Sequence, residues 1–223
     1  MTLSPSIDPV RLLSSVGHDL RQPFQAMRLF LHLLQGRLSD PGQVELAGRL
    51  EEALEIGAAQ MDAVLTLASL AAGTARVRRE QVPLGPLLDR VVGELAPQAE
   101  AAGIRLRLVR SSVTVQTDPV MLDRLLRAVV ENAIHHGRRG GKVVIGVRRA
   151  GGPALLVADD GPGIPADQRS RMLEPGGRLD RADGPARRGL GLGLALTDHI
   201  ARSLDHDLML GGDRGLSVLL RLG

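Results

Sequence analysis

A histidine stands beside an aspartate near the start of the chain, in the stretch SSVGHDLRQPFQAM at residues 14–27. An acidic neighbour can orient an imidazole ring, raise its basicity and accept its proton, so His18 and Asp19 could together support attack on a phosphorus atom. Pro23 follows in the same helical pattern, where it removes a backbone N–H and permits a bend. On a helical wheel His18 lies about 160° from the apolar stripe and therefore faces solvent. By itself this segment fits a reactive histidine and a solvated surface histidine equally well.

Two segments in the second half of the chain carry polar side chains suited to a nucleotide. RAVVENAIHHG has a helical pattern and presents Asn132, whose amide oxygen could bind a hard cation such as Mg²⁺ that bridges phosphates. VADDGPGIP is typical of a strand that ends in a glycine turn, where Asp159 could accept a hydrogen bond from an exocyclic amine beside Gly161 and Gly163. Each has a simpler explanation, because helices have polar faces and DDGPG is an excellent β-turn.

A third segment, RRGLGLGLALTDHI, alternates Gly189, Gly191 and Gly193 and leads directly into a helical pattern. Alternating glycines let backbone N–H groups approach an anion closely, and the N-terminus of the helix adds its positive dipole. The spacing is not that of the dinucleotide-binding fingerprint, since no strand precedes it. Alone, such a segment is more often a turn than a phosphate site.

Two long helical stretches precede these segments. Apolar residues recur at helical spacing over residues 10–38 and again over about 43–71, and the breaker cluster GRLSDPGQ separates them. This pattern predicts an antiparallel hairpin. One hairpin cannot bury both apolar stripes, so we expect two chains to pair into a dimeric four-helix bundle. Leu29 lies on the same side as His18, where an exposed apolar residue indicates a docking surface.

Strands mix with helices after a short polar passage. Strands are predicted in IRLRLVR, KVVIGVRR, ALLVAD and LSVLLRL, and helices in PLLDRVVGELAPQAEAAG, DPVMLDRLLRAVVENAIHHG and LGLALTDHIARSL. Asp118 suits the N-cap of the second of these helices and Pro119 its first turn. A sheet covered mainly on one side predicts an α/β sandwich. The expected parts are a hairpin at 1–72, a linker at 73–81 and an α/β domain at 82–223.

Composition excludes several classes of protein. The 223 residues contain no cysteine, no tryptophan, no tyrosine and two phenylalanines, so the core is aliphatic, disulfides and thiolate metal sites are excluded, and no aromatic platform can stack single-stranded bases. The net charge is +3, and no basic run is dense enough to indicate nucleic acid. The sequence has neither a signal-peptide pattern nor an 18-residue apolar stretch, so we expect no membrane segment and a cytoplasmic location.

In their order along the chain, these motifs resemble the catalytic core of bacterial sensor histidine kinases. HDLRQP stands at the His-acid-x-x-x-Pro motif of that family, the helix beginning at DPVML at its N box, and DDGPGIP and GLGLGLAL at its two glycine boxes. Residues 10–71 resemble the dimerisation and histidine-phosphotransfer domain. Residues 80–223 resemble the ATP-binding domain shared with gyrase, the Hsp90 chaperones and the MutL proteins.

The resemblance implies a role for each candidate residue. His18 would be the phosphoacceptor and Asp19 its acidic helper, while Gln22 stands where many relatives align a water for dephosphorylating the partner. Asn132 would bind Mg²⁺ and Asp159 the adenine amine of ATP. Gly161 and Gly163 would shape the nucleotide pocket. A nucleotide lid would span about residues 166–188, and its end would be formed by Gly189, Gly191 and Gly193.

Three positions depart from the family's pattern. Ala128 replaces a second asparagine one turn before Asn132, His135 replaces the usual lysine and is kept as a nucleotide-contacting candidate, and Leu173 stands where the lid often has phenylalanine. These changes lower the expected affinity for ATP and the expected rate of autophosphorylation.

The resemblance implies ATP-dependent autophosphorylation of His18 in a homodimer and phosphoryl transfer to an aspartate on the receiver domain of a response regulator. The alternative is a histidine phosphotransfer scaffold whose ATP-binding domain no longer binds nucleotide. An ATP-driven switch like gyrase is disfavoured, because such proteins use a catalytic glutamate at the position of Ala128.

Overall fold

The computed structural model describes residues 9–73, 76–149, 151–177, 191–212 and 215–223, and for residues 9–15 and 18 it describes the backbone alone. The chain divides into two compact units, Met1–Ala75 and Arg76–Gly223. Each unit is described by itself.

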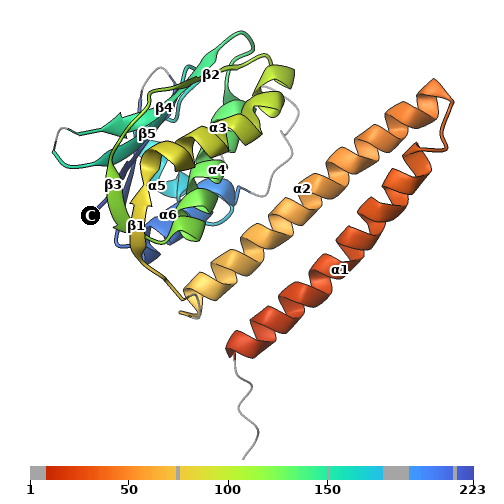
Figure 1. The fold of residues 1–223 in the computed structure, drawn as a ribbon, viewed down its shortest axis with the longest axis horizontal. Coiled ribbons are helices and arrows are strands. Elements are labelled where there is room, and N and C mark those ends of the chain that lie inside the picture. Colours follow the sequence, from red (N-terminus) through yellow and green to blue (C-terminus); the bar gives the residue numbers. More distant parts are fainter. Residues whose placement is uncertain (1–8, 74–75, 150, 178–190, 213–214) are drawn as a thin grey trace, which may run out of the picture. The chain divides into compact units, whose positions relative to one another are not determined.

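The first unit is a hairpin in which α1 (Pro9–Gln35) and α2 (Pro41–Ala71) lie side by side (Figure 1). α1 continues through Pro23 as one helix, and Leu38, expected in its apolar stripe, lies beyond its end. α2 begins where the Asp40 carboxylate accepts the Gln43 N–H at 2.9 Å. A proline follows this cap in the first turn, where its missing N–H leaves no hydrogen bond unmade.

The two helices meet through a glycine and through charged side chains. A Cβ atom at Gly57 would lie 3.0 Å from Cε1 of Phe24, so the glycine lets this ring pack closely against α2. Arg21 donates from Nε to Oδ1 of Asp62 at 2.7 Å, which ties α1 to α2 near the predicted phosphoacceptor. The sequence therefore specifies both the pairing and the register of the hairpin.

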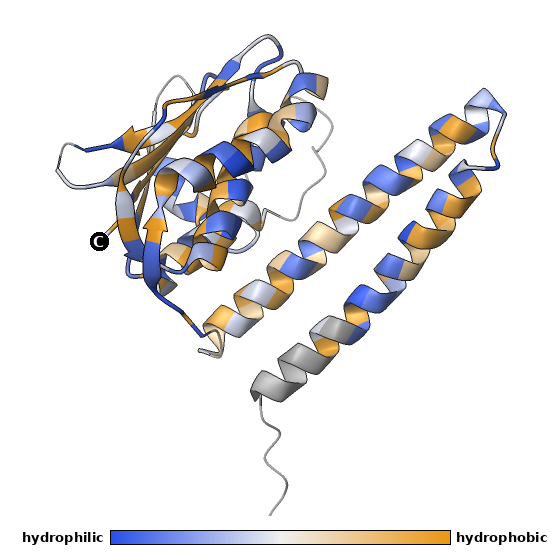
Figure 2. Cartoon of the chain, in the orientation of Figure 1, coloured by the Kyte–Doolittle hydropathy of each residue, from blue (hydrophilic) through white to orange (hydrophobic). Residues whose placement is uncertain are grey.

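Many apolar side chains of the hairpin remain exposed within this chain. Figure 2 shows apolar residues distributed along both of its helices. Leu31 and Ala47 are buried between the helices. The exposed large apolar residues are Val16, Leu20, Met27, Leu29, Phe30, Leu33 and Leu34 on α1, and Val44, Leu46, Leu50 and Val64 on α2. The hairpin thus covers only part of its apolar surface, as expected for half of a bundle.

α2 also has the length and composition of a helix able to cross a membrane, whereas the sequence analysis found no such stretch. The difference arises because alanine and leucine dominate residues 54–71 of α2, where Glu55 and Asp62 are the only charged residues. A bundle helix that has one face open to a second chain passes the same test, and Asp62 of α2 pairs with α1. The test therefore carries little weight here.

The second unit is an α/β sandwich, as predicted. Among the described residues its elements are β1 (Glu80–Pro83), α3 (Leu84–Ala101), β2 (Arg105–Leu108), β3 (Thr114–Thr117), α4 (Pro119–His136), β4 (Lys142–Arg148), β5 (Ala154–Asp159), η1 (Ala166–Gln168), α5 (Arg169–Met172), α6 (Gly193–Ser203), β6 (Asp207–Gly211) and β7 (Ser217–Arg221).

Five of the strands form one mixed sheet in the order β2-β4-β5-β7-β6, and β1 pairs with β3 in a small separate sheet. β2 runs parallel to β4, and the other neighbours are antiparallel. The helices α3, α4 and α6 lie on one face of the large sheet (Figure 1). Fully buried aliphatic side chains, such as Leu126 on α4 and Ile145 on β4, fill the space between these layers.

Three strands, β1, β3 and β6, were absent from the sequence prediction. Each has only four or five residues, and the stretches EQVP and TVQT contain no apolar run. Their strand conformation depends on pairing with a distant segment, as when Val82 pairs with Val115. Such a pairing cannot be predicted from the local sequence of either strand.

The start of α4 is joined to the segment that follows the hairpin. Asp118 caps α4 as predicted, because its Oδ1 accepts the N–H groups of Val120 and Met121, each at 3.0 Å. Its Oδ2 accepts the N–H of Arg78 at 2.7 Å. One buried carboxylate thus holds both the predicted linker and the helix that carries Asn132.

Candidate functional site

The phosphoacceptor candidate lies in the first half of α1. The backbone of His18 is helical, and its side chain lies outside the described residues, as does the wheel-based expectation of its exposure. Asp19 and Gln22 are exposed on the same helix, and Pro23 follows directly. The structure therefore places these candidates together on one helix that is accessible to another molecule.

The nucleotide candidate is built around Asp159 at the end of β5. Its Oδ1 accepts the N–H of Gly161 at 2.8 Å and the N–H of Leu216 at 3.1 Å. Two donors on one oxygen fix the orientation of the carboxyl group and leave Oδ2 able to accept from a ligand. Burial raises the pKa of the Asp159 carboxyl, the two N–H groups oppose this effect, and the charge of Asp160 adds to it.

The adjacent Asp160 makes different hydrogen bonds. Both oxygens of Asp160 accept the backbone N–H of Lys142, each at 3.1 Å, at the start of β4. A Cβ atom at Gly141 would overlap the same carboxylate. Asp160 therefore holds the start of β4 against the end of β5, whereas Asp159 keeps one carboxylate oxygen able to accept from a ligand.

The glycines of the first box are required by close backbone contacts. Gly163 has φ +69°, and a Cβ atom there would lie 2.9 Å from the carbonyl oxygen of Gly215. A Cβ atom at Gly161 would lie 2.8 Å from both the Asp159 carboxylate and the carbonyl oxygen of His136. A Cβ atom at Gly215 would overlap the carbonyl oxygen of Asp159. Gly215 was missed by the sequence analysis, because its contact with Asp159 exists only in the folded sheet.

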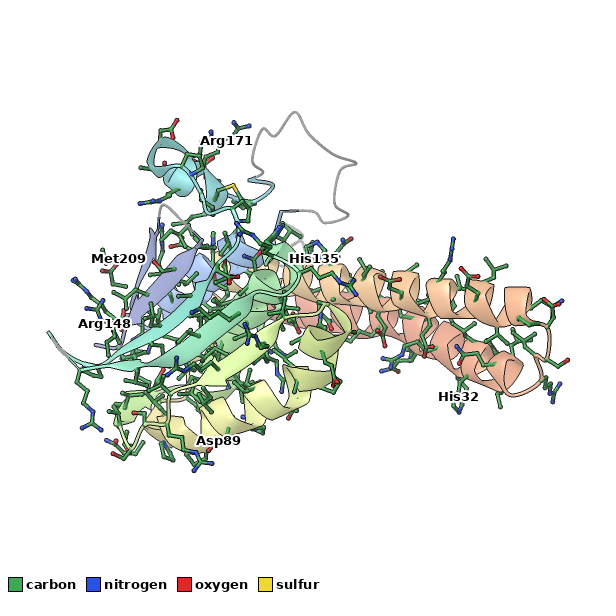
Figure 3. The ribbon with its side chains drawn as sticks, turned by 90° about the horizontal axis from the view of Figure 1, so that it is seen from above. His32, Asp89, His135, Arg148, Arg171 and Met209 are labelled. Carbon is green, nitrogen blue, oxygen red and sulfur yellow. The ribbon has the colours of Figure 1, made fainter. Side chains whose placement is uncertain are left out.

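The contact between Gly161 and His136 also brings the end of α4 to this turn. Asn132 lies one turn before that end and is half-buried, while Ala133 and Ile134 face the core. His135 is exposed and labelled in Figure 3, and its ring meets the ring of His136 edge-on at 4.9 Å between centroids. The structure thus gathers Asn132, His135 and the Asp159 turn at one end of the domain.

The second glycine box leads into α6, which packs against α4. Gly191 has φ +66°, a conformation that favours glycine, and Gly193 is the first residue of α6. The residue at the N-cap is Leu192, whose side chain has no acceptor for the first N–H groups of the helix, so these can serve an anion. Gly189 and residues 178–188 of the predicted lid lie outside the described residues.

Described lid residues are fixed near the first glycine box. Arg169 donates to the carbonyl oxygens of Ile164 at 3.1 Å and Gly212 at 2.9 Å. Leu173, in place of the expected phenylalanine, is half-buried. The hydrogen bond from Arg169 to Gly212 joins the start of the lid to the residue that follows β6.

Among the described residues, no group of three His, Asp or Glu side chains could hold a metal ion by itself. Asn132 offers one amide oxygen, and in the described part of the chain its side chain is engaged by no hydrogen bond. This arrangement fits Mg²⁺ that takes most of its ligands from nucleotide phosphates and water.

Two family models match the chain. Residues 10–73 match the His Kinase A (phospho-acceptor) domain, and residues 117–222 match the histidine kinase-, DNA gyrase B- and HSP90-like ATPase domain. Together these matches cover most of the sequence.

The chain is similar to sensor proteins from several bacteria. It is 27% identical to the swarming motility regulation sensor protein RssA of Serratia marcescens over 218 residues, which cover 95% of this chain and 46% of RssA. It is 29% identical to the alginate biosynthesis sensor protein KinB of Pseudomonas aeruginosa over 82% of this chain and 31% of KinB. It is also 29% identical to the sensor protein CutS of Streptomyces coelicolor over 86% of this chain and 47% of CutS. The chain thus spans less than half the length of these relatives.

Solved structures share the fold. Full-length ShkA, crystallised in complex with AMPPNP, superposes with a TM-score of 0.75 at 23% identity, over 96% of this chain and 45% of that one. The histidine kinase AdeS of Acinetobacter baumannii superposes with a TM-score of 0.64 at 20% identity, over 92% of this chain and 97% of that one.

Proposed function

Because the chain belongs to the sensor histidine kinase family, we propose that it is a protein histidine kinase that phosphorylates His18 with ATP. The phosphoryl group then passes to an aspartate on the receiver domain of a response regulator. The proposal takes the hairpin as residues 1–72, the linker as 73–81 and the ATP-binding domain as 82–223. It places this catalytic core in the cytoplasm.

The observation that carries the proposal is the geometry of Asp159. A half-buried carboxylate is costly unless hydrogen bonds orient it, and here two N–H groups hold one oxygen while the other can accept from the adenine amine. Close backbone packing at Gly161, Gly163 and Gly215 fixes this turn. The site therefore fits a flat ring that presents an exocyclic amine.

Asn132 and the start of α6 fit the phosphate end of the same nucleotide. The Asn132 oxygen would hold Mg²⁺, which neutralises phosphate charge when it is bound. Backbone N–H groups at Gly191–Gly193 would bind phosphate oxygens, and His135 would approach from the end of α4. These residues position and neutralise the triphosphate, which is most of what phosphoryl transfer requires.

The step on the hairpin uses groups of α1. A ring nitrogen of His18 forms a bond to the γ-phosphorus, the bond from that phosphorus to the bridging oxygen breaks, and ADP leaves. Asp19 orients the imidazole and takes its proton. Gln22, one turn further and exposed, could align a water that removes the phosphoryl group from the regulator.

The exposed apolar face of the hairpin supports a homodimer. Residues such as Leu46 and Leu50 face solvent within this chain and would be buried in a four-helix bundle. The exposed Leu29 would contribute to the surface on which the receiver domain docks.

Labelled ATP tests the phosphoacceptor. We expect protein-bound label that is stable in base and lost in acid, and we expect His18→Ala to abolish it. His32→Ala is the matched control, because His32 is an exposed histidine on the same helix. Label at the wild-type level on His18→Ala would contradict the assignment.

Calorimetry with a non-hydrolysable ATP analogue and Mg²⁺ tests the nucleotide site. Asp159→Asn should weaken binding about 100-fold, because the new amide N–H₂ would meet the adenine amine donor to donor. Asp160→Asn is the control, since that carboxylate serves Lys142. The wild-type protein should bind more tightly as the pH rises through the raised pKa of Asp159.

If the wild-type protein bound no analogue at millimolar concentration, the function would instead be that of a phosphotransfer scaffold. The substitutions Ala128, His135 and Leu173 would then explain the loss of nucleotide binding.

A further inference from the structure

The five-stranded sheet has a second face that no described helix covers. None of the residues proposed for phosphorylation lies on this face. α3, α4 and α6 all lie on the other face. Along β7, and along β4 as far as Ile145, buried residues alternate with more exposed ones, so the second face is open to solvent. We call it the outer face.

An apolar row crosses the outer face from edge to edge. Leu156 pairs with Leu219, which pairs in turn with Met209 at one edge. On its other side Leu156 pairs with Gly146, and a Cβ atom at Gly146 would lie 2.9 Å from Cβ of Val109. The side chain of Val109 therefore continues the row over the glycine. Val109 and Met209 are 48% and 43% exposed, and the two leucines between them are half-buried.

Cations border this row on both sides. The exposed ones are Arg105 and Arg107 on β2, Lys142 and Arg148 on β4, and Arg221 on β7. Arg148 lies two residues from Gly146 along β4, about 7 Å from the row. Figure 3 shows Arg148 and Met209 at the same margin of the domain, away from His135. Asp207 is the single exposed carboxylate that the described strands place on this face.

In the described part of the chain no ion pair involves any of these five cations, although Asp207 lies opposite Arg221 in the register of β6 and β7. Arg105 and Lys142 are direct neighbours in the register of β2 and β4, although neighbouring like charges destabilise a sheet. The excess of four positive charges on this face exceeds the net charge of +3 of the whole chain. Folding therefore concentrates positive charge on this face, and Asp207 compensates for only part of it.

We propose that the outer face docks an acidic amphipathic helix of another protein, with its apolar stripe on the row and its carboxylates against the bordering cations. Five strands extend over about 19 Å, which matches about 13 residues of α-helix. A second copy of the face would repel the first. A lipid surface requires protruding apolar groups, whereas Leu156 and Leu219 at the centre of the row are half-buried. Helix-in-groove binding by apolar anchors is the recognition mode that fits.

The probe is a fluorescein-labelled 14-residue helical peptide with a leucine stripe flanked by glutamates, titrated into the full chain and followed by fluorescence polarisation. A peptide of the same composition with the stripe scattered is the control. We expect Arg148→Glu to weaken binding of the striped peptide about fivefold and Asp207→Asn to strengthen it. Arg37→Glu, an exposed reversal in the hairpin turn, should leave binding unchanged.

A second pair of variants tests the apolar row. Met209→Ser should weaken binding, and Val120→Ser should not, although Val120 is 62% exposed on α4. Unchanged thermal unfolding temperatures show that these surface variants keep the fold. Equal binding of both peptides, or equal effects of Arg148→Glu and Arg37→Glu, would overturn the proposal. Binding to vesicles of phosphatidylserine and phosphatidylcholine with no binding of the striped peptide would overturn it in favour of a lipid surface. The test is independent of phosphorylation, because it needs neither ATP nor His18.

Discussion

The hairpin and the α/β unit are both rich in apolar residues, but the hairpin exposes most of its large apolar side chains and the α/β unit buries most of its own. In the described residues, fourteen large apolar side chains are exposed, and eleven of them belong to the hairpin. The hairpin buries Leu31 and Ala47, whereas the α/β unit encloses a continuous aliphatic core between helices and sheet. One hairpin has a single neighbouring helix for each of its helices, while α4 is packed against α3, α6 and the sheet.

The difference indicates that the two units are stabilised in different ways. The α/β unit removes its own apolar surface from water and should fold as an independent domain. The hairpin leaves most of its large apolar side chains exposed, and in the proposed homodimer a second chain covers them, so its stability should depend on protein concentration. Matched changes in the two units can break or sharpen this comparison.

The largest difference is expected for leucine truncation. Leu126→Ala on α4 should cost about 3 kcal/mol in the free energy of unfolding of the α/β unit, because the side chain is 1% exposed and its loss leaves a cavity. Leu46→Ala on α2, where the side chain is 68% exposed, should leave that unfolding transition unchanged and weaken dimerisation. Urea unfolding and sedimentation equilibrium measure the two effects. If Leu46→Ala lowered the stability of the α/β unit as much as Leu126→Ala, the two units would not be independent.

Helix capping should give the next largest difference. Both α2 and α4 begin with Asp-Pro, but Asp118 is buried and accepts three N–H groups, whereas Asp40 is exposed and accepts that of Gln43. We expect Asp118→Ala to cost about 2 kcal/mol and Asp40→Ala about 0.5 kcal/mol. Chemical unfolding of each variant measures these values. Equal costs would show that the Arg78 contact adds nothing.

A smaller difference should appear in the response to acid. His206 is buried, its Nε2 lies 2.9 Å from Oγ1 of Thr117, and burial lowers its pKa, an effect to which the charge of Arg79 adds and which Asp205 opposes. The neutral form is therefore favoured in the folded state. Its contribution to stability is present above about pH 6.5, the usual value for histidine, and is lost as the pH falls through the lowered pKa.

Unfolding of the α/β unit measured from pH 8 to pH 5 tests this effect. His206→Gln should reduce the loss of stability on acidification, and His32→Gln, which changes an exposed histidine of the hairpin, should not. Identical pH profiles for the wild-type protein and His206→Gln would assign the acid sensitivity to other groups.

Sequence patterns predicted the elements that have strong local signals. Helical patterns predicted α1, α2, α3, α4 and α6. The alternation of IRLRLVR predicted β2, and the apolar stretches KVVIGVRR, ALLVAD and LSVLLRL predicted β4, β5 and β7. The cap at Asp118 followed from its residue type and from Pro119, because capping is a local interaction. Signals of this kind do not extend to β1, β3 and β6, which are short and take their conformation from distant partners.

The sequence by itself determined the order of the motifs, the type of each long element and the side chains available for chemistry, because periodicity and residue type act over a few residues. The sequence proposed Asp159 for the ligand, and only the tertiary structure showed how the two aspartates of this turn differ in their contacts. Asp159 and Asp160 are neighbours of identical chemistry, but the N–H groups that each accepts come from different strands and turns. The tertiary structure likewise revealed Gly215 beneath Asp159 and assembled the charged outer face from separate strands, because pairing across a sheet joins residues that are far apart in the chain.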